Sequence, residues 1–214
     1  MRIDVDGVER HVALHRQQDG VVARALVLIA GGGPGSEFVE ESAAELSAKG
    51  YASLVIDDPD VTTPEQIRAV FDHVADSSET PVPQAILGFS PAGPDVWRLM
   101  ESDAERIDMA FLVSCALPRG EFDFQQLRAT GVRAVFAEGG EVYRSSYQRA
   151  HGPMSSIPTP HDFLVYGNGI TDIYYDRASQ AFHDETWRAT LESLADWFDI
   201  WAPGSASAGA HPDH

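Results

Sequence analysis

A serine stands where a buried strand is expected to turn into a helix. The segment 88–93 (GFSPAG) follows the apolar run 84–87, and Ser90 has a small residue two positions before it and another two positions after it. A serine on such a corner is exposed and can attack a carbonyl carbon if a base takes its proton. The next residue, Pro91, has no backbone N–H to stabilise the resulting oxyanion. The corner therefore predicts carbonyl chemistry at Ser90, with one hydrogen-bond donor missing.

The residues after the serine predict the shape of this corner. Pro94 lacks the N–H that a helix capped by Ser90 would use for its first internal hydrogen bond. A helix with Gly93 as its cap and Pro94 as its first residue is easier to build. We therefore expect a longer corner, with Ser90 facing the pocket from a loop and with Phe89 and Pro91 beside the substrate. The alternative is that Ser90 and Pro91 form an ordinary turn before a helix.

Carboxylates also follow the expected strands. Asp57 comes directly after the apolar run 51–56, where it is either a functional residue or part of a solvated turn. Carboxylates that share a site can divide into one acid and one base through mutual repulsion. Asp57 and Asp58 are adjacent, so they point in opposite directions in an extended segment, and no histidine or cysteine stands nearby. We expect Asp57 to contact substrate and expect no metal site.

The elements that would position these residues alternate between strands and helices. Asp6-Gly7 favours a hairpin of two short strands within residues 1–17. Apolar runs typical of buried strands then occur at 25–30, 51–56, 84–87, 107–115, 132–137 and 163–166. Helices are expected at 37–49, 64–75, 94–104, 122–130, 142–150 and 178–201. This alternation indicates a three-layer α/β sandwich: a mainly parallel sheet of about seven or eight strands, covered by helices on both faces and without a large cap domain.

Length and composition limit the other possibilities. With 214 residues, of which 43% are hydrophobic, we expect one domain over residues 1–202 and a disordered tail over 203–214. The net charge of −18 opposes binding to nucleic acid or to an anionic membrane. Cys115 is the only cysteine, so an internal disulfide is impossible and a reducing compartment fits. We expect a cytoplasmic monomer or homodimer that acts on a small molecule and uses no cofactor.

The order of these elements, the glycine-rich segment 31–35 and the corner at 88–93 resemble the α/β-hydrolase superfamily, in particular its small dienelactone hydrolase-like branch. The resemblance covers nearly the whole chain. It implies that Ser90 is the nucleophile and that Glu141, with Glu138 as a second candidate, is the acid of a catalytic triad.

The same resemblance assigns the glycine-rich segment to the oxyanion hole. Gly32 and Gly33 would provide the remaining donor and contact the substrate. A purely conformational role, which allows the chain to turn sharply, is the alternative.

The resemblance also implies a histidine after the last strand, and this chain has none there. The segment 167–173 reads GNGITDI. A serine hydroxyl is a weak nucleophile without an adjacent base. Asp172 is our candidate base, although a carboxylate with a pKa near ~3.9 suits pH 7 poorly unless burial raises that pKa. Thr171 and Tyr174 are expected to line the pocket, where Tyr174 either donates a hydrogen bond to a carbonyl or packs in the core.

Three histidines elsewhere are weaker candidates for the missing base. His161 is expected to precede the last strand, at the edge of the sheet where ligands do not normally bind. His183 is expected inside the final helix. His151 is expected at the end of a helix, from which it could fold over the site.

These observations leave three functions open. The first is an enzyme that transfers protons next to a carbonyl, giving cyclisation, isomerisation, epimerisation or elimination without a complete triad. The second is a dienelactone hydrolase-like esterase or lactonase that uses Ser90. The third is a ligand-binding protein without catalytic activity.

Overall fold

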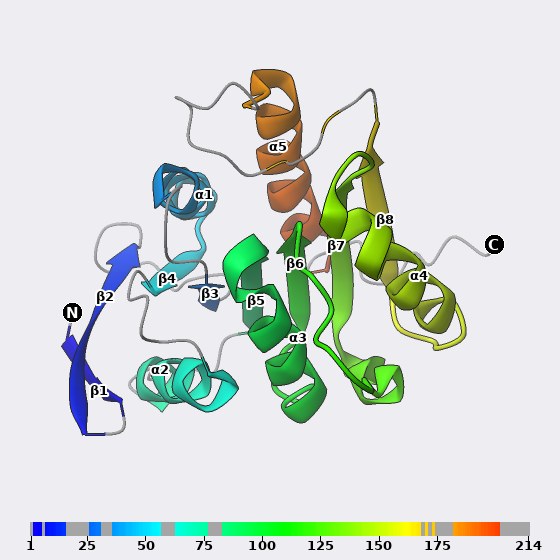
Figure 1. Ribbon diagram of the computed structural model, residues 1–214. Coiled ribbons are helices and arrows are strands. Elements are labelled where there is room, and N and C mark those ends of the chain that lie inside the picture. Colours follow the sequence, from blue (N-terminus) through cyan, green and yellow to red (C-terminus); the bar gives the residue numbers. More distant parts are fainter. Residues whose placement is uncertain are drawn as a thin grey trace.

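The computed structural model describes residues 2–5, 7–15, 26–30, 36–56, 63–76, 83–167, 170, 173 and 182–201. The expected tail at 203–214 lies outside these residues. An eight-stranded sheet runs through the molecule in the order β1-β2-β4-β3-β5-β6-β7-β8 (Figure 1). Its strands are Arg2–Val5 (β1), Val8–His15 (β2), Leu26–Ala30 (β3), Ala52–Ile56 (β4), Gln84–Phe89 (β5), Met109–Val113 (β6), Gly131–Ala137 (β7) and His161–Tyr166 (β8).

Most of the sheet is parallel. Strands β3 to β8 pair in parallel, whereas β1 pairs antiparallel with β2 and β2 pairs antiparallel with β4. Strands β5 and β6 are buried almost throughout, which explains why they appear in the sequence as continuous apolar runs. The hairpin turns at Gly7 (φ 76°), whose N–H donates to the Asp4 carboxylate over 2.8 Å.

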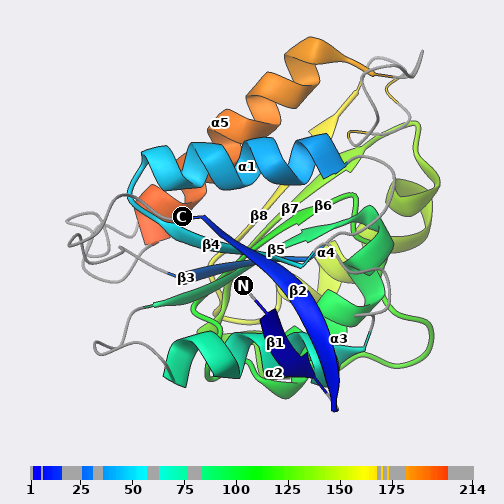
Figure 2. The same ribbon diagram turned by 90° about the vertical axis from the view of Figure 1, so that its left-hand side faces the viewer.

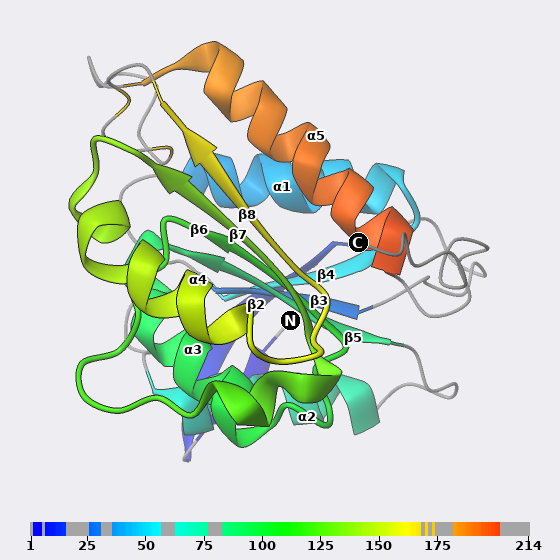
Figure 3. The ribbon, with the colours of Figure 1, turned by 90° about the vertical axis from the view of Figure 1, so that its right-hand side faces the viewer.

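Helices cover both faces of the sheet, as Figures 2 and 3 show from opposite sides. On one face lie α1 (Ser36–Ala48) and α5 (Asp184–Trp201), which pack on a core that includes Val55, Leu87 and Phe111. The other face carries α2 (Pro64–Asp76), α3 (Gly93–Ser102) and α4 (Gln148–Met154). The three-layer α/β sandwich predicted from the sequence is confirmed. None of the described helices is long and apolar enough to cross a bilayer.

Several helix ends follow from local sequence. Thr63 and Gln66 form a reciprocal cap at the start of α2: the Thr63 hydroxyl accepts from the Gln66 N–H, and the Gln66 side chain accepts from the Thr63 N–H, both over 3.3 Å. Gly50 follows α1 with φ 89°, a left-handed conformation that glycine adopts without strain.

Other boundaries differ from the prediction. The segment expected as a short helix at 122–130 is a 3-10 helix, Phe124–Ala129. The helix expected at 142–150 contains a π-helical turn, Tyr143–Tyr147, and continues as α4. Helix α5 begins at Asp184, six residues later than expected, and β8 begins at His161, two residues earlier.

The strand order identifies the edge where a ligand would bind. β3 lies between β4 and β5, so the chain builds the sheet outward from β3 in both directions. In open α/β sheets, ligands bind at the carboxyl ends of the strands next to such a reversal. The corner that contains Ser90 directly follows β5 and therefore lies at this position.

Candidate active site

The corner after β5 is longer than a single sharp turn. Ser90, Pro91 and Ala92 form a 3-10 turn, and α3 starts at Gly93, whose N–H donates to the Ser90 carbonyl. The N-cap of α3 is Ala92, one residue before the expected cap Gly93, so Pro94 is the second residue of the helix instead of the first. Among the described non-glycine residues, positive φ occurs only at Ser114, so Ser90 is not held in a strained left-handed conformation.

The turn after Ser90 offers few N–H donors to a substrate. Pro91 has none. The next N–H, that of Ala92, is directed at the Phe89 carbonyl by the hydrogen-bond pattern of a 3-10 turn. Phe89 itself is fully buried in the core beneath α1 and α5, so its side chain anchors the corner instead of lining a pocket. Phe89 was expected beside the substrate; with its side chain in the core, only its backbone is available for such a contact.

The neighbouring segment after β6 packs tightly against this corner. A Cβ placed on Gly93 would lie 2.8 Å from both the Cys115 Cα and the Ala116 nitrogen, so only glycine fits there. The Trp97 indole N–H donates to the Cys115 carbonyl over 3.5 Å. The Cys115 thiol donates to the Val113 carbonyl, and burial raises the pKa of this thiol far above its usual range. Cys115 is therefore a structural residue with no thiolate at neutral pH.

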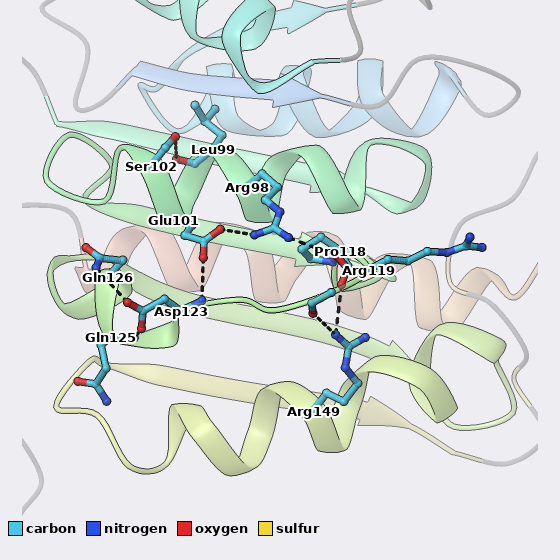
Figure 4. A network of polar contacts seen from close by, with 11 residues as sticks. Arg98, Leu99, Glu101, Ser102, Pro118, Arg119, Asp123, Gln125, Gln126 and Arg149 are labelled. Atoms are coloured by element: carbon cyan, nitrogen blue, oxygen red, sulfur yellow. Dashed lines mark hydrogen bonds and ion pairs between the residues drawn. The ribbon is translucent and has the colours of Figure 1, made fainter.

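The loop that continues from Cys115 is fixed by arginines on two helices (Figure 4). Arg98 of α3 forms an ion pair with Glu101 over 2.6 Å, and the other Glu101 oxygen accepts the Asp123 N–H over 2.7 Å. Arg149 of α4 donates to the carbonyls of Pro118 and Gly120 over 3.2 and 3.4 Å. These contacts join the segment after Leu117 to α3 and α4.

Strands β7 and β8 bring an acidic turn to the same edge of the sheet. The Glu138 N–H donates to the Tyr166 carbonyl over 2.9 Å, and the Gly139 N–H donates to the Ile170 carbonyl over 3.0 Å. A Cβ placed on Gly167 would lie 3.0 Å from a Glu138 carboxylate oxygen. The Glu138 side chain therefore lies against the segment after β8, where a triad histidine was expected, and Ile170 occupies that segment.

Glu141 lies farther along the same turn. Like Glu138, it is exposed, and it lies at the point where the chain enters the helix that precedes α4. Of the two candidate acids, Glu138 is the one that lies next to the end of β8. The assignment of Glu141 as the acid of a catalytic triad stays a prediction. The other expected site residues, Gly32, Gly33, Asp57, Thr171, Asp172 and Tyr174, lie outside the described residues.

Two of the histidines contact residues other than Ser90. His151 does not end a helix, because α4 continues to Met154, and its ring stacks on Tyr147 with centroids 5.2 Å apart. His161 does not precede β8 but is its first residue. Its Nδ1 lies 2.9 Å from the Thr159 carbonyl, at the amino edge of the sheet. His161 therefore lies at the edge of the sheet that was predicted for it from the sequence, opposite the edge where ligands bind.

His183 lies before α5 rather than inside it. Its Nδ1 accepts the Thr186 N–H over 3.3 Å and lies 2.9 Å from the Thr186 hydroxyl, so the imidazole caps the helix. A neutral ring that accepts at Nδ1 carries its proton at Nε2 and has no free lone pair for a serine proton. In the described part of the chain, no histidine is hydrogen-bonded to Ser90.

The charge near the corner is negative. Asp95 lies in the first turn of α3, and burial, followed by repulsion from Glu65, raises the pKa of its carboxyl group.

The described residues contain no group of three or more side chains that could hold a metal ion. A surface groove of about 610 Å³, lined by residues 101–106, Gln125 and Gln126, lies at the other end of α3, away from Ser90.

Sequence reasoning missed Ser114. This residue was expected inside a strand over 107–115, but β6 ends at Val113, and Ser114 is buried with φ 50°. Non-glycine residues in this region are strained and often lie at functional sites. The sequence signal that could have pointed to Ser114 is a polar residue near the end of the otherwise apolar run 109–115.

Comparison with known proteins gives a likeness of structure alone. No protein-family model and no curated sequence matches the chain. A protein assigned as a dienelactone hydrolase from Klebsiella pneumoniae superposes with a TM-score of 0.68 at 12% identity, over 91% of this chain and 94% of its own. Est1E from Butyrivibrio proteoclasticus, solved with ferulic acid, gives 0.67 at 15% identity, over 92% and 99%.

A third neighbour is described as lacking a lid. A serine hydrolase without a lid from Xanthomonas campestris gives a TM-score of 0.67 at 14% identity, over 99% of this chain and 95% of its own. Such low identities carry information about the fold and not about the reaction. The protein has the α/β-hydrolase fold, and its structural neighbours include esterases and a dienelactone hydrolase-like protein.

Proposed function

We propose that the protein is an enzyme that moves a proton next to the carbonyl group of a small metabolite, without an acyl-serine intermediate. The observation that carries this proposal is the corner itself. Within the described residues Ser90 has no histidine partner, and Pro91 removes a donor that acyl transfer normally uses. Both features impair attack by the serine hydroxyl but leave it able to donate a hydrogen bond.

In this mechanism Ser90 donates a hydrogen bond to the substrate carbonyl oxygen, and a carboxylate takes the proton from the adjacent carbon. The electron pair of the broken C–H bond forms an enolate, whose negative charge lies largely on that oxygen. Return of the proton to the opposite face gives epimerisation, and return to another carbon gives isomerisation. Cyclisation or elimination would begin with the same proton transfer.

Glu138 is the best-placed base among the described carboxylates. Its side chain lies against the segment after β8, at the carboxyl edge that also carries Ser90. Glu141 and Asp172 are the alternatives. We expect Asp57, Gly32, Gly33, Thr171 and Tyr174 to contribute further contacts, and we expect the enzyme to work in the cytoplasm as a monomer or homodimer.

Proton exchange with solvent tests this proposal without knowledge of the substrate. A panel of small aldehydes, ketones, β-keto esters and lactones is incubated with the protein in D2O, and loss of the α-proton signal is followed by NMR. We expect catalysed exchange for at least one compound class, reduced about 10²-fold or more in Glu138→Gln, the order expected for removal of a general base. Glu105→Gln is the matched control, because Glu105 is exposed at the far end of α3. Catalysed exchange that survives unchanged in Glu138→Gln and Ser90→Ala would refute this assignment.

The alternative is an esterase or lactonase that uses Ser90 as a nucleophile. The names of the structural neighbours and the position of Ser90 after β5 favour it. Hydrolysis of p-nitrophenyl esters that disappears in Ser90→Ala would support this alternative. Thermal stabilisation by a panel compound without exchange or hydrolysis would instead indicate a binding protein.

A further inference from the structure

Two backbone N–H groups beside the corner have no acceptor among the described residues. Within the described part of the chain, neither the Cys115 N–H nor the Ala116 N–H donates a hydrogen bond, although the next N–H, that of Leu117, donates to the Ser146 hydroxyl over 3.0 Å. Cys115 is fully buried and Ala116 is half-buried. Buried backbone donors nearly always have a partner, and no described residue supplies one for these two groups.

The sheet register places this segment next to Ser90. Phe89 of β5 pairs with Val113 of β6, so the following residues, Ser90 and Ser114, leave neighbouring strands at the same level. The Ser114 N–H still bonds the Val135 carbonyl over 2.9 Å, after which its φ of 50° redirects the chain.

The redirected chain runs against the start of α3. A Cβ on Gly93 would lie 2.8 Å from the Ala116 nitrogen. Gly93 is itself the residue whose N–H bonds the Ser90 carbonyl. The Ala116 N–H is therefore close to the turn that holds Ser90 and Pro91.

The direction of the Ala116 N–H follows from the Trp97 contact. The Cys115 carbonyl accepts from the Trp97 indole, which lies one turn into α3 from Gly93. All peptide bonds among the described residues are trans, and in a trans peptide the C=O and the following N–H point in opposite directions. The Ala116 N–H therefore points away from the Trp97 indole nitrogen, while the Ala116 nitrogen itself lies beside Gly93 at the start of α3.

We propose that the Ala116 N–H donates the hydrogen bond to the substrate carbonyl oxygen that Pro91 cannot donate. This inference rests on the proposed function, because it concerns the same substrate oxygen. It assigns Ala116 as a backbone catalytic residue, and it gives Ser114 a positioning role, since the left-handed conformation of Ser114 directs the chain toward α3. The ligand class is a carbonyl compound whose oxygen becomes negative during the reaction.

Replacement of the Ala116 amide by an ester tests the donor directly. Ala116→lactic acid removes the N–H and retains the methyl side chain. We expect exchange of the panel substrate to fall about 10²-fold, the typical loss for one oxyanion donor. Gly120→glycolic acid, in the same loop, is the control and should retain its rate. An Ala116 ester that folds and exchanges at the normal rate would overturn the inference.

A second measurement decides the question if the ester variant does not fold or if no panel compound reacts. ¹⁵N-labelled protein is titrated with acetate, a small oxyanion, and the amide signals are followed by NMR. We expect a saturable downfield shift of the Ala116 amide proton that is weakened in Trp97→Phe. No shift at Ala116 would overturn the inference.

The two proposals fail in distinguishable ways. A panel reaction that requires Glu138 but not the Ala116 N–H leaves the proposed function standing and removes the inference. An acetate-induced shift at Ala116 without any catalysed exchange supports the donor site and removes the proposed function.

Discussion

Gly93→Ala is expected to destabilise the fold at the corner that carries Ser90. The added Cβ would lie 2.8 Å from the Ala116 nitrogen and from the Cys115 Cα, and both contacts involve backbone that cannot rotate away. Overpacking typically costs ~1–3 kcal/mol, and contacts under 3.0 Å with rigid backbone correspond to the upper part of that range, about 2–3 kcal/mol, against a gain of up to ~1 kcal/mol from placing alanine in a helix. A net loss of ~1–2 kcal/mol corresponds to a fall in Tm of about 2–8 °C for a domain of this size.

Gly152→Ala is the matched control. Gly152 lies in α4, and a Cβ placed there meets no atom within 4 Å. Helix propensity alone then raises stability by about 0.5–1 kcal/mol. Thermal and guanidinium unfolding of the two variants, followed by circular dichroism, measure both effects. Equal stabilisation by the two substitutions would refute the close approach between α3 and the segment after β6.

Three further predictions concern single side chains. The Cys115 thiol should react with a disulfide reagent only at the rate of unfolding, because it is buried and its pKa is raised; rapid reaction of native protein would contradict its placement. The folded-state pKa of Asp95 is raised, so Asp95→Asn should increase the free energy of unfolding at pH 7. This stabilisation should disappear as the pH falls through the raised pKa to below ~3.9, where Asp95 is protonated in both states. A stabilisation that is unchanged at low pH would contradict the raised pKa of Asp95. Thr63→Ala should lower the free energy of unfolding by ~1 kcal/mol in chemical denaturation through loss of the cap on Gln66, whereas an unchanged midpoint would show that the cap is not formed.

The sequence was informative where one local signal determines a structure. Buried strands such as 84–89 appear as apolar runs because both faces are covered. Gly50 and Thr63 mark helix ends because their preferred conformations and hydrogen bonds are local. The position of Gly93 and Pro94 predicted the longer corner for the same reason.

Features that depend on distant contacts were not predictable. His183 reads as part of the final helix, but its ring accepts the Thr186 N–H and begins α5 instead. The burial of Phe89 and the strain at Ser114 depend on neighbouring strands and helices. Glu138 could be preferred over Glu141 only when the end of β8 was placed beside it.

Reaction with a fluorophosphonate probe tests most directly whether Ser90 acts as a nucleophile. The intact protein is treated with excess probe, and adducts are located by mass spectrometry, with Ser90→Ala as the control. A hydroxyl without a base reacts slowly, so we expect no adduct on Ser90 under conditions that label a serine esterase completely. Rapid, stoichiometric labelling that is lost in Ser90→Ala would contradict proton transfer without an acyl-serine and would establish an activated nucleophile.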